Sequence, residues 1–149
     1  MADNKTKQVE TNLDLLTQQK PGAVVIDSDG YAWQKDGDEF LDRWYRCLFR
    51  TETLSTDELA ATGPITATTA DKTKRKHKKP AGLVHTSKEH YDAHRLLDDM
   101  PHGSVVLDRH GEAWQDDTGY WFGSFAVPDE PLSSYDLAFH APITPLTTK

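Results

Sequence analysis

The sequence predicts a mostly β fold with some helix (α+β), built from two tandem copies of one small α-β-β-β-α-β module. The first observation is a repeat: residues 22–34 recur as residues 103–115, displaced by 81 positions and identical at eight of thirteen. The second is a match near the end of each copy, where residues 54–66 and 132–144 agree at seven of thirteen positions. Each copy is expected to form a bent antiparallel sheet or an SH3-like half barrel.

Each long repeat is expected to be a β-hairpin closed by a two-residue turn. An Asp-Gly pair lies between two apolar runs at 29–30, and a His-Gly pair takes its place at 110–111. Such pairs suit type I′ turns, because both central residues of that turn need positive φ. A two-residue turn sets Ile26 opposite Trp33, with the equivalent pairing in the second copy.

The first copy contains further elements around its hairpin. A short helix is expected to begin at Asn12, and a long aromatic-rich strand is expected over 40–49. Ser55 and Glu58 form a capping box, in which each side chain pairs with the other residue's backbone N–H, so a helix begins there. Residues 65–68 are predicted to form a closing strand that returns beside the first strand.

The second copy repeats this order. Ser87 and Ser133 are expected to cap helices, residues 120–127 to form an aromatic strand, and residues 142–144 to close the module. The predicted parts of the chain are a disordered N-terminus (1–11), a first β module (12–70), a basic linker (71–86) and a second β module (87–149).

Composition favours two small cores in a cytoplasmic protein without disulfides. Hydrophobic residues make up 36% of the chain and the mean hydropathy is −0.70, which are low values for one well-packed core. No apolar run approaches the ~20 residues that span a bilayer, and the N-terminus lacks the apolar region of a signal peptide. The single cysteine, Cys47, lies among apolar residues and is expected to be a core thiol.

Charge is distributed unevenly along the chain. The net charge is −7, yet six Lys or Arg and no acid fall between positions 72 and 79. The rest of the chain then carries 11 basic and 24 acidic residues. The basic stretch is expected to be a charged linker that lies free or against the acidic modules. It could instead contact phosphates, through Lys72, Lys74, Arg75, Lys76, Lys78 and Lys79.

Five aromatic side chains are candidates for contact with a partner protein. The two predicted aromatic strands carry rings on both faces, so some of these rings are expected to face away from their own core. Those rings either pack one module against the other or form an exposed binding patch. The candidates are Trp44, Tyr45, Tyr120, Trp121 and Phe125.

No pattern in the sequence indicates catalysis, a cofactor or a metal. Residues 27–30 resemble the start of a calcium loop, but their glycine is fourth instead of sixth. His90 and His94 have the helical spacing that can hold zinc, yet the Glu of a metalloprotease is absent between them, and solvated or partner-facing histidines are expected. Neither a nucleophile–His–acid pattern nor a Gly-rich phosphate loop is found. A non-enzymatic protein is therefore expected.

The pattern Gly-x-Val-Val-x-Asp-x-Asp-Gly-x-Ala-Trp, at 22–33 and 103–114, resembles short modules of uncharacterised tandem β-repeat proteins from actinobacteria and their bacteriophages. A later aromatic strand and a Gly-Pro-Ile-Thr ending, at 63–66 and 141–144, extend the resemblance, while His110 and Ala141 depart from it. The resemblance brings no activity. It implies a small phage-encoded accessory protein that acts in the host cytoplasm or is assembled into a virion.

Three functions remain open at the level of sequence. The leading one is an accessory protein that binds a host or virion protein through its β modules. The second is a nucleic-acid-associated protein that uses the basic linker, with steeply salt-dependent binding. The third is a protein that sequesters a small ligand in a pocket between the modules, so that the ligand raises the melting temperature. A homodimer formed through sheet edges is a further alternative.

Overall fold

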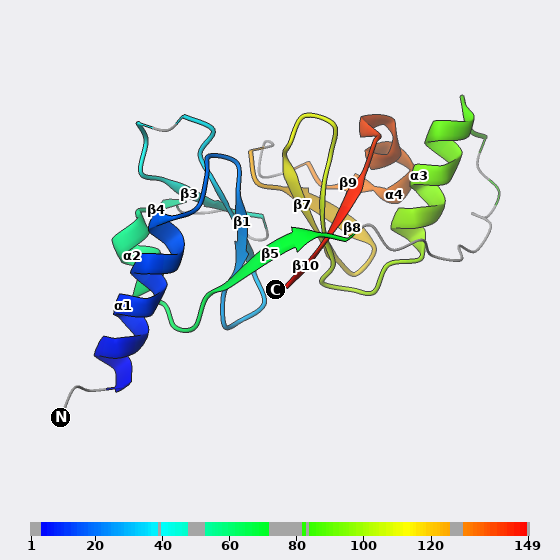
Figure 1. Cartoon of the computed structure of the whole chain (residues 1–149). Helices are drawn as coiled ribbons and strands as arrows, with labels where there is room; N and C mark the ends of the chain where they lie inside the picture. The colour runs from blue at the N-terminus through cyan, green and yellow to red at the C-terminus, as the bar shows by residue number, and fades with distance from the viewer. Residues whose placement is uncertain are drawn as a thin grey trace.

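A computed structural model gives the structure of the chain and describes residues 4–38, 40–47, 53–71, 82, 84–125 and 130–148. These residues form a mixed α+β fold in which ten antiparallel strands make one sheet, curled into a half barrel with helices at its two ends (Figure 1). The predicted fold class and the bent antiparallel sheet are confirmed.

The strands of the sheet come equally from the two halves of the described chain. The strand order is β4-β3-β2-β1-β5-β10-β6-β7-β8-β9. The first half contributes β1 (Val24–Ile26), β2 (Ala32–Lys35), β3 (Trp44–Arg46), β4 (Thr53–Leu54) and β5 (Thr66–Ala70). The second half contributes β6 (Val105–Leu107), β7 (Ala113–Asp117), β8 (Tyr120–Gly123), β9 (Leu132–Ser133) and β10 (Thr144–Thr148).

The last strand of each half returns beside its first strand, as predicted. β5 pairs with β1, and β10 pairs with β6. β5 and β10 also pair with each other, with Leu146 opposite Ala70. This central pairing joins the two halves into one continuous sheet.

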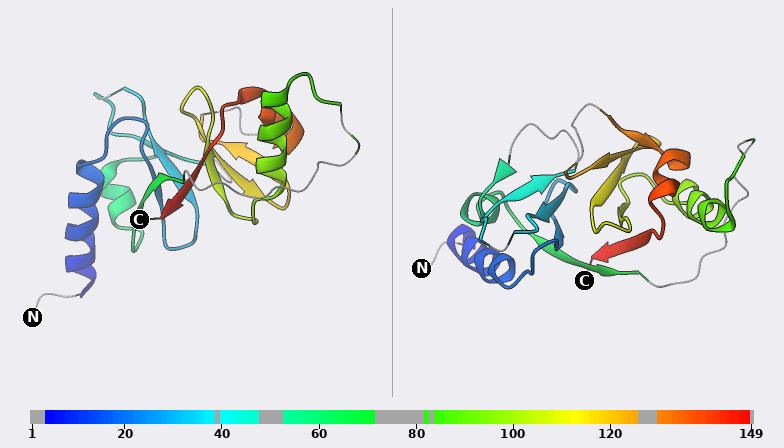
Figure 2. Two further views of the ribbon diagram at one scale, coloured as in Figure 1. Left: turned by 45° about the vertical axis from the view of Figure 1, so that its right-hand side comes forward. Right: turned by 90° about the horizontal axis from the view of Figure 1, so that it is seen from above.

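Helices cover the two ends of the sheet (Figure 2). The Ser55 capping box is formed as predicted, and Ser87 and Ser133 each accept a backbone N–H at a helix start. A hydroxyl that accepts such an N–H satisfies one of the donors that a helix leaves unpaired at its start. The elements are α1 (Asn4–Thr17) and α2 (Thr56–Ala60) at one end, with α3 (Lys88–Asp98), α4 (Ser134–Leu137) and the 3₁₀ helix η1 (Ala138–His140) at the other.

The predicted disorder over residues 1–11 is wrong from Asn4 onward, because α1 begins there. Val9, Leu13 and Leu16 lie on one face of α1 and pack against the core of the first half. These residues follow helical spacing, so a polar segment is held by a single apolar face.

The predicted register of the hairpins is wrong by one residue. Trp33 lies opposite Val25, and Ile26 lies opposite Ala32; the second half shows the same shift. The loop has three residues instead of two, since the Asp27 carboxylate accepts the Asp29 N–H inside it and the Tyr31 N–H at its end, and Gly30 takes a φ of +87°. A shift of one residue exchanges the two faces of a strand.

The long strand predicted over residues 40–49 is also shorter than expected. Only Trp44–Arg46 is a strand in the described part of that range, and residues 48 and 49 lie outside it. Asp36 and Asp38 each accept the backbone N–H two residues later, and such side-chain turns compete with strand pairing. The strand predicted over 120–127 ends at Gly123, and residues 126 and 127 lie outside the described part.

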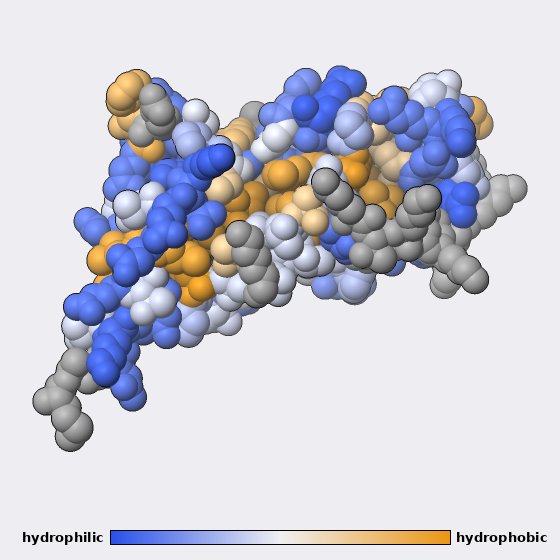
Figure 3. All heavy atoms as spheres, viewed as in Figure 1, coloured by the Kyte–Doolittle hydropathy of each residue, from blue (hydrophilic) through white to orange (hydrophobic). Residues whose placement is uncertain are grey.

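Three clusters of buried residues hold the fold together. One lies under α1 and α2, one under α3, α4 and η1, and the third lies between the halves. Figure 3 shows apolar residues gathered over the middle of the sheet, between more hydrophilic ends. The cluster between the halves contains Val24, Ala32, Cys47, Val105 and Ala113, with Ile26, Leu107 and Leu146 against it.

Two buried glutamines join the halves by reciprocal hydrogen bonds. Gln34 accepts the Ala113 N–H at 2.7 Å, and Gln115 accepts the Ala32 N–H at 2.8 Å. Each carboxamide also donates to a glycine carbonyl in the hairpin loop of the opposite half. Both side chains are at most 1% exposed, and each also donates to a glycine carbonyl of its own half. Their side-chain oxygens accept backbone N–H groups of the other half, so separating the halves would break these buried hydrogen bonds.

Candidate binding groove

The two tryptophans among the predicted partner-binding residues are buried inside their own halves. Trp44 is 0% exposed and Trp121 is 1% exposed. The Trp44 indole N–H donates to Thr56, and that of Trp121 donates to Ser134. Both rings therefore anchor a sheet to its short helix, and neither offers surface to a partner as predicted.

The other three predicted aromatic residues lie nearer the surface. Tyr45 and Phe125 form an edge-to-face pair across the two halves, with ring centroids 5.0 Å apart. Phe125 is 39% exposed and Tyr120 is 56% exposed. Tyr45 and Phe125 thus pack one half against the other, which was the first alternative for these rings. The exposure of Tyr120 leaves it open to a partner.

The predicted nucleic-acid contacts lie outside the described residues. This applies to Lys72, Lys74, Arg75, Lys76, Lys78 and Lys79.

An apolar groove of about 480 Å³ opens between α3 and the segment that leads into β10. Apolar side chains, several of them small, form its floor, and charged side chains of α3 form its rim. Because apolar surface flanked by charge is typical of recognition sites, this groove is the candidate site of the molecule. Its lining residues are Lys88, Glu89, Asp92, Ala93, Leu96, Ala141, Pro142 and Ile143.

In the first half, the corresponding space is filled by one side chain. Asn12 of α1 is 1% exposed and donates to the carbonyls of Ala60, at 2.9 Å, and Gly63. Its side-chain oxygen accepts the Ile65 N–H at 3.3 Å and the Gln8 amide at 3.0 Å. Asn12 thereby clamps α1 to the segment that leads into β5.

In the second half, this clamp is absent. Ala93 stands 81 positions after Asn12, and Glu89 stands 81 positions after Gln8. The residues 78 positions after Gly63 and Ile65 are Ala141 and Ile143, which line the groove. The groove therefore lies where the first half has its asparagine clamp.

The neighbouring face of α3 carries a histidine cluster, in which His90 and His94 replace Val9 and Leu13 of α1 at the same spacing of 81. His90 and His94 are each 3% exposed, so the expectation that they are solvated or face a partner is wrong. The His90 Nε2 donates to the Tyr135 carbonyl at 2.8 Å, and the ring stacks on Phe139 at 4.0 Å. These contacts bury His90 between α3, α4 and η1.

A third histidine completes this cluster. His85 Nε2 and His94 Nδ1 are 2.8 Å apart and share one hydrogen bond. Burial lowers the pKa of His94, against the opposing effect of Asp98, and the nearby His85 and His90 lower it further. Within the described ranges, no three His, Cys, Asp or Glu side chains are arranged to hold a metal ion.

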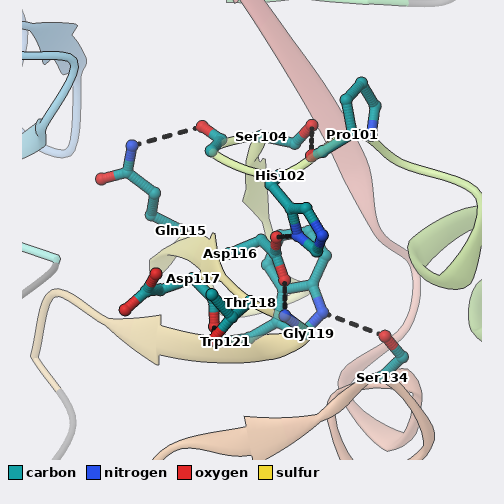
Figure 4. A network of polar contacts seen from close by, with 11 residues as sticks. Pro101, His102, Ser104, Gln115, Asp116, Asp117, Thr118, Gly119, Trp121 and Ser134 are labelled. Carbon is teal, nitrogen blue, oxygen red and sulfur yellow. Dashed lines mark hydrogen bonds and ion pairs between the residues drawn. The ribbon is translucent and has the colours of Figure 1, made fainter.

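A polar network on the far side of β7 is a structural support for a turn (Figure 4). His102 Nδ1 lies 2.9 Å from Asp116, whose other carboxylate oxygen accepts the Gly119 N–H at 3.1 Å. Thr118 in this turn has a φ of +54°, a conformation that costs free energy for a β-branched residue. The Asp116 carboxylate therefore stabilises the β7–β8 turn and ties it to the segment before β6.

A smaller cavity of about 260 Å³ lies at the seam between the halves. Residues from both halves line it, and none of them is charged. The lining residues are Ile26, Gly30, Thr68, Gly103, Ser104, Val105, Leu146, Thr147 and Thr148.

Comparison with known proteins identifies no relative. No family model, curated protein or solved structure matches the chain. No helix in the described part of the chain is long and apolar enough to cross a membrane.

Sequence reasoning did not find the groove. The signal lay in the repeat itself, where Asn12 is replaced by Ala93 while the flanking Leu16 and Leu97 stay equivalent. A small residue in place of a buried polar one predicts a space at that position.

Proposed function

We propose that the protein is a non-enzymatic accessory protein that binds an apolar segment of another protein in the groove beside α3. The single observation that carries this proposal is the groove itself, because the first half fills the same place with its own side chain. The partner that we propose is a host or virion protein, in line with the resemblance to phage-encoded modules.

The rim supports a protein partner over a purely apolar ligand. Lys88, Glu89 and Asp92 stand around a floor of alanine, proline and isoleucine. An apolar floor supplies binding free energy, and the charged rim adds orientation and specificity.

The test is affinity capture from actinobacterial lysate with the intact protein and two matched variants. Leu96 lines the groove, and Leu15 is the corresponding residue of α1, half-buried like Leu96. L96E places a carboxylate in the groove, so we expect it to lose a protein that wild type and L15E retain.

Each lysate is also divided into nuclease-treated and untreated halves. Retention that survives nuclease and is lost only in L96E supports the groove. Retention by L96E equal to wild type contradicts the proposal, as does loss of all retained protein after nuclease treatment. The second result supports the nucleic-acid alternative and the basic linker.

The cavity at the seam favours a second candidate function, the sequestering of a small uncharged ligand between the halves. Hydroxyl groups of Thr68, Ser104 and Thr147 accompany apolar residues around it. A ligand there raises the melting temperature in proportion to its occupancy. A thermal-shift screen of small uncharged compounds tests this candidate, with Ser104→Leu as the variant that closes the cavity.

A further inference from the structure

We propose that residues 84–86 form a pH-sensitive strap, which is docked on α3 and α4 near neutral pH and released when two facing imidazoles are both protonated. One imidazole belongs to His85 of this strap and the other to His94 of α3. The inference goes beyond the proposed function and does not depend on what occupies the groove. It follows from the side chain that docks the strap and from the hydrogen bond that this side chain makes.

His85 is the side chain through which the strap packs on the helices. Val84 is 82% exposed and Thr86 is exposed, whereas His85 is half-buried. The His85 ring lies edge-to-face against Tyr91 of α3, with ring centroids 4.9 Å apart. The strap backbone is tied to α4 by the Tyr135 hydroxyl, which donates to the Val84 carbonyl at 2.7 Å. The strap is therefore docked by one ring and a backbone hydrogen bond.

The hydrogen bond between His85 Nε2 and His94 Nδ1, at 2.8 Å, has room for a single proton. A neutral imidazole has one N–H and one lone pair, whereas an imidazolium has two N–H groups and no acceptor. The bond therefore survives a first proton on the pair and is lost with the second. A second proton would also place two positive rings with centroids only 5.0 Å apart.

The surroundings of the pair also disfavour two charges. Burial lowers the pKa of His94, Asp98 opposes this effect, and His85 and His90 lower the pKa further. Asp98 is thus the carboxylate that favours a charged His94, and burial outweighs it. Within the described ranges, the titratable or charged side chains around the cluster are His90, Tyr91, Arg95 and Asp98 of α3 and Tyr135 of α4, with Glu89 and Arg109 lining the cavity beside His90.

The docked strap therefore binds one proton fewer than the released strap, whose two imidazoles titrate independently. Free imidazoles titrate near pH 6.5, so docking is complete above that pH and weakens below it. The ratio of released to docked strap should rise by up to about tenfold for each pH unit below about pH 6. Release moves His85 away from α3 and uncovers the rings that it contacts, which are those of His90, Tyr91, His94 and Tyr135.

The direct test is an NMR pH titration of the full-length isotope-labelled protein. We expect NOEs between the rings of His85 and Tyr91, and high heteronuclear NOE values for the strap amides, near about pH 8. Both should be lost by about pH 5, while the indole N–H resonance of the buried Trp121 stays in place. Absence of the ring NOEs near pH 8, their persistence at pH 5, or loss of the indole resonance in the same step overturns the proposal.

Two variants replace one imidazole each by a carboxamide that does not titrate. H85Q places its amide near the position of Nε2, and H94N places its amide near the position of Nδ1, so either can share a hydrogen bond with the remaining ring. Both should remove the pH dependence of the strap's heteronuclear NOE values. H110Q, which changes an exposed histidine, is the matched control and should keep the wild-type profile. A wild-type profile in H85Q or H94N, or its loss in H110Q, contradicts the proposal.

Discussion

The two halves share their strand order, and three of the differences between α1 and α3 change how these helices pack. In α1, Val9 and Leu13 pack against the core and Asn12 hydrogen-bonds to the backbone. None of these three side chains is titratable. The residues 81 positions later are His90, Ala93 and His94. They give α3 two buried imidazoles and leave the groove open beside it. The comparison teaches that the second half lacks the hydrogen bonds of the asparagine clamp, and that it has a groove and two buried histidines where the first half has that clamp and two aliphatic side chains.

The hairpin loops of the two halves also share one contact and differ in another. Asp27 accepts the Trp33 indole N–H at 2.8 Å, and Asp108 accepts that of Trp114 at 3.0 Å. Asp108 alone also contacts an imidazole, that of His140, at 3.2 Å. The shared contact stabilises the loop, and the added histidine again lies in the second half.

The largest effect is expected at the seam that joins the halves. Q34L leaves buried groups of the opposite half unpaired and should lower the free energy of unfolding by about 2–4 kcal/mol. Q115L should cost less, because Gln34 has the additional donor Ser124. Urea unfolding measures both, with exposed Gln18→Leu as control. Equal losses from the two variants contradict the asymmetry.

Removing the asparagine clamp makes the first half resemble the second. N12A should lower the free energy of unfolding by about 2 kcal/mol, since it leaves buried carbonyls and the Ile65 N–H unpaired. Urea unfolding again measures the change. T11A, on the exposed side of the same helix turn, is the matched control. A loss below about 0.5 kcal/mol means that Asn12 is not the clamp of α1.

A smaller effect is expected from the ring pair that bridges the halves. A double-mutant cycle of Y45A and F125A should give a coupling of about 0.5–1.5 kcal/mol, the usual range for an aromatic pair. Chemical denaturation of the four proteins measures this energy. Strict additivity shows that the two rings touch without stabilising the seam.

The smallest effect is expected from pH, through His94 of the second half. Because the folded-state pKa of His94 is lowered, the unfolded chain binds a proton first as the pH falls below about 6.5. The stability contributed by the neutral ring is complete above that pH and is lost as the pH falls to the lowered folded-state pKa.

H94L, which copies Leu13, removes this dependence. Urea unfolding of wild type and H94L between about pH 8 and about pH 5 should show the wild type losing more stability on acidification. Parallel pH profiles of the two proteins would mean that His94 does not titrate differently on unfolding.

Local signals were sufficient to predict much of the fold. The hydroxyl caps at Ser55, Ser87 and Ser133 mark true helix starts, and each closing strand returns beside the first strand of its half. Errors arose where one carboxylate reorganised the backbone, as Asp27 did in the hairpin loop. Propensity and periodicity do not report such side-chain turns.

The candidate site was harder to predict, because it consists of a space. Ala93 and Ile143 are far apart in sequence, and neither residue type indicates a function. The groove is visible only when Ala93 is compared with Asn12 and the contacts of Asn12 are known. The histidines were noticed, but helical spacing does not reveal which face of α3 packs against η1.

The central pairing of β5 with β10 has a consequence for the ribosome-bound chain. The first half can be complete through β5 while residues 144–148 have not yet been synthesised, and until then one edge of β5 has no partner. An unpaired edge can accept any other strand, including β5 of a neighbouring nascent chain. Translation speed over the second half therefore sets how long each molecule is exposed to pairing with the wrong strand.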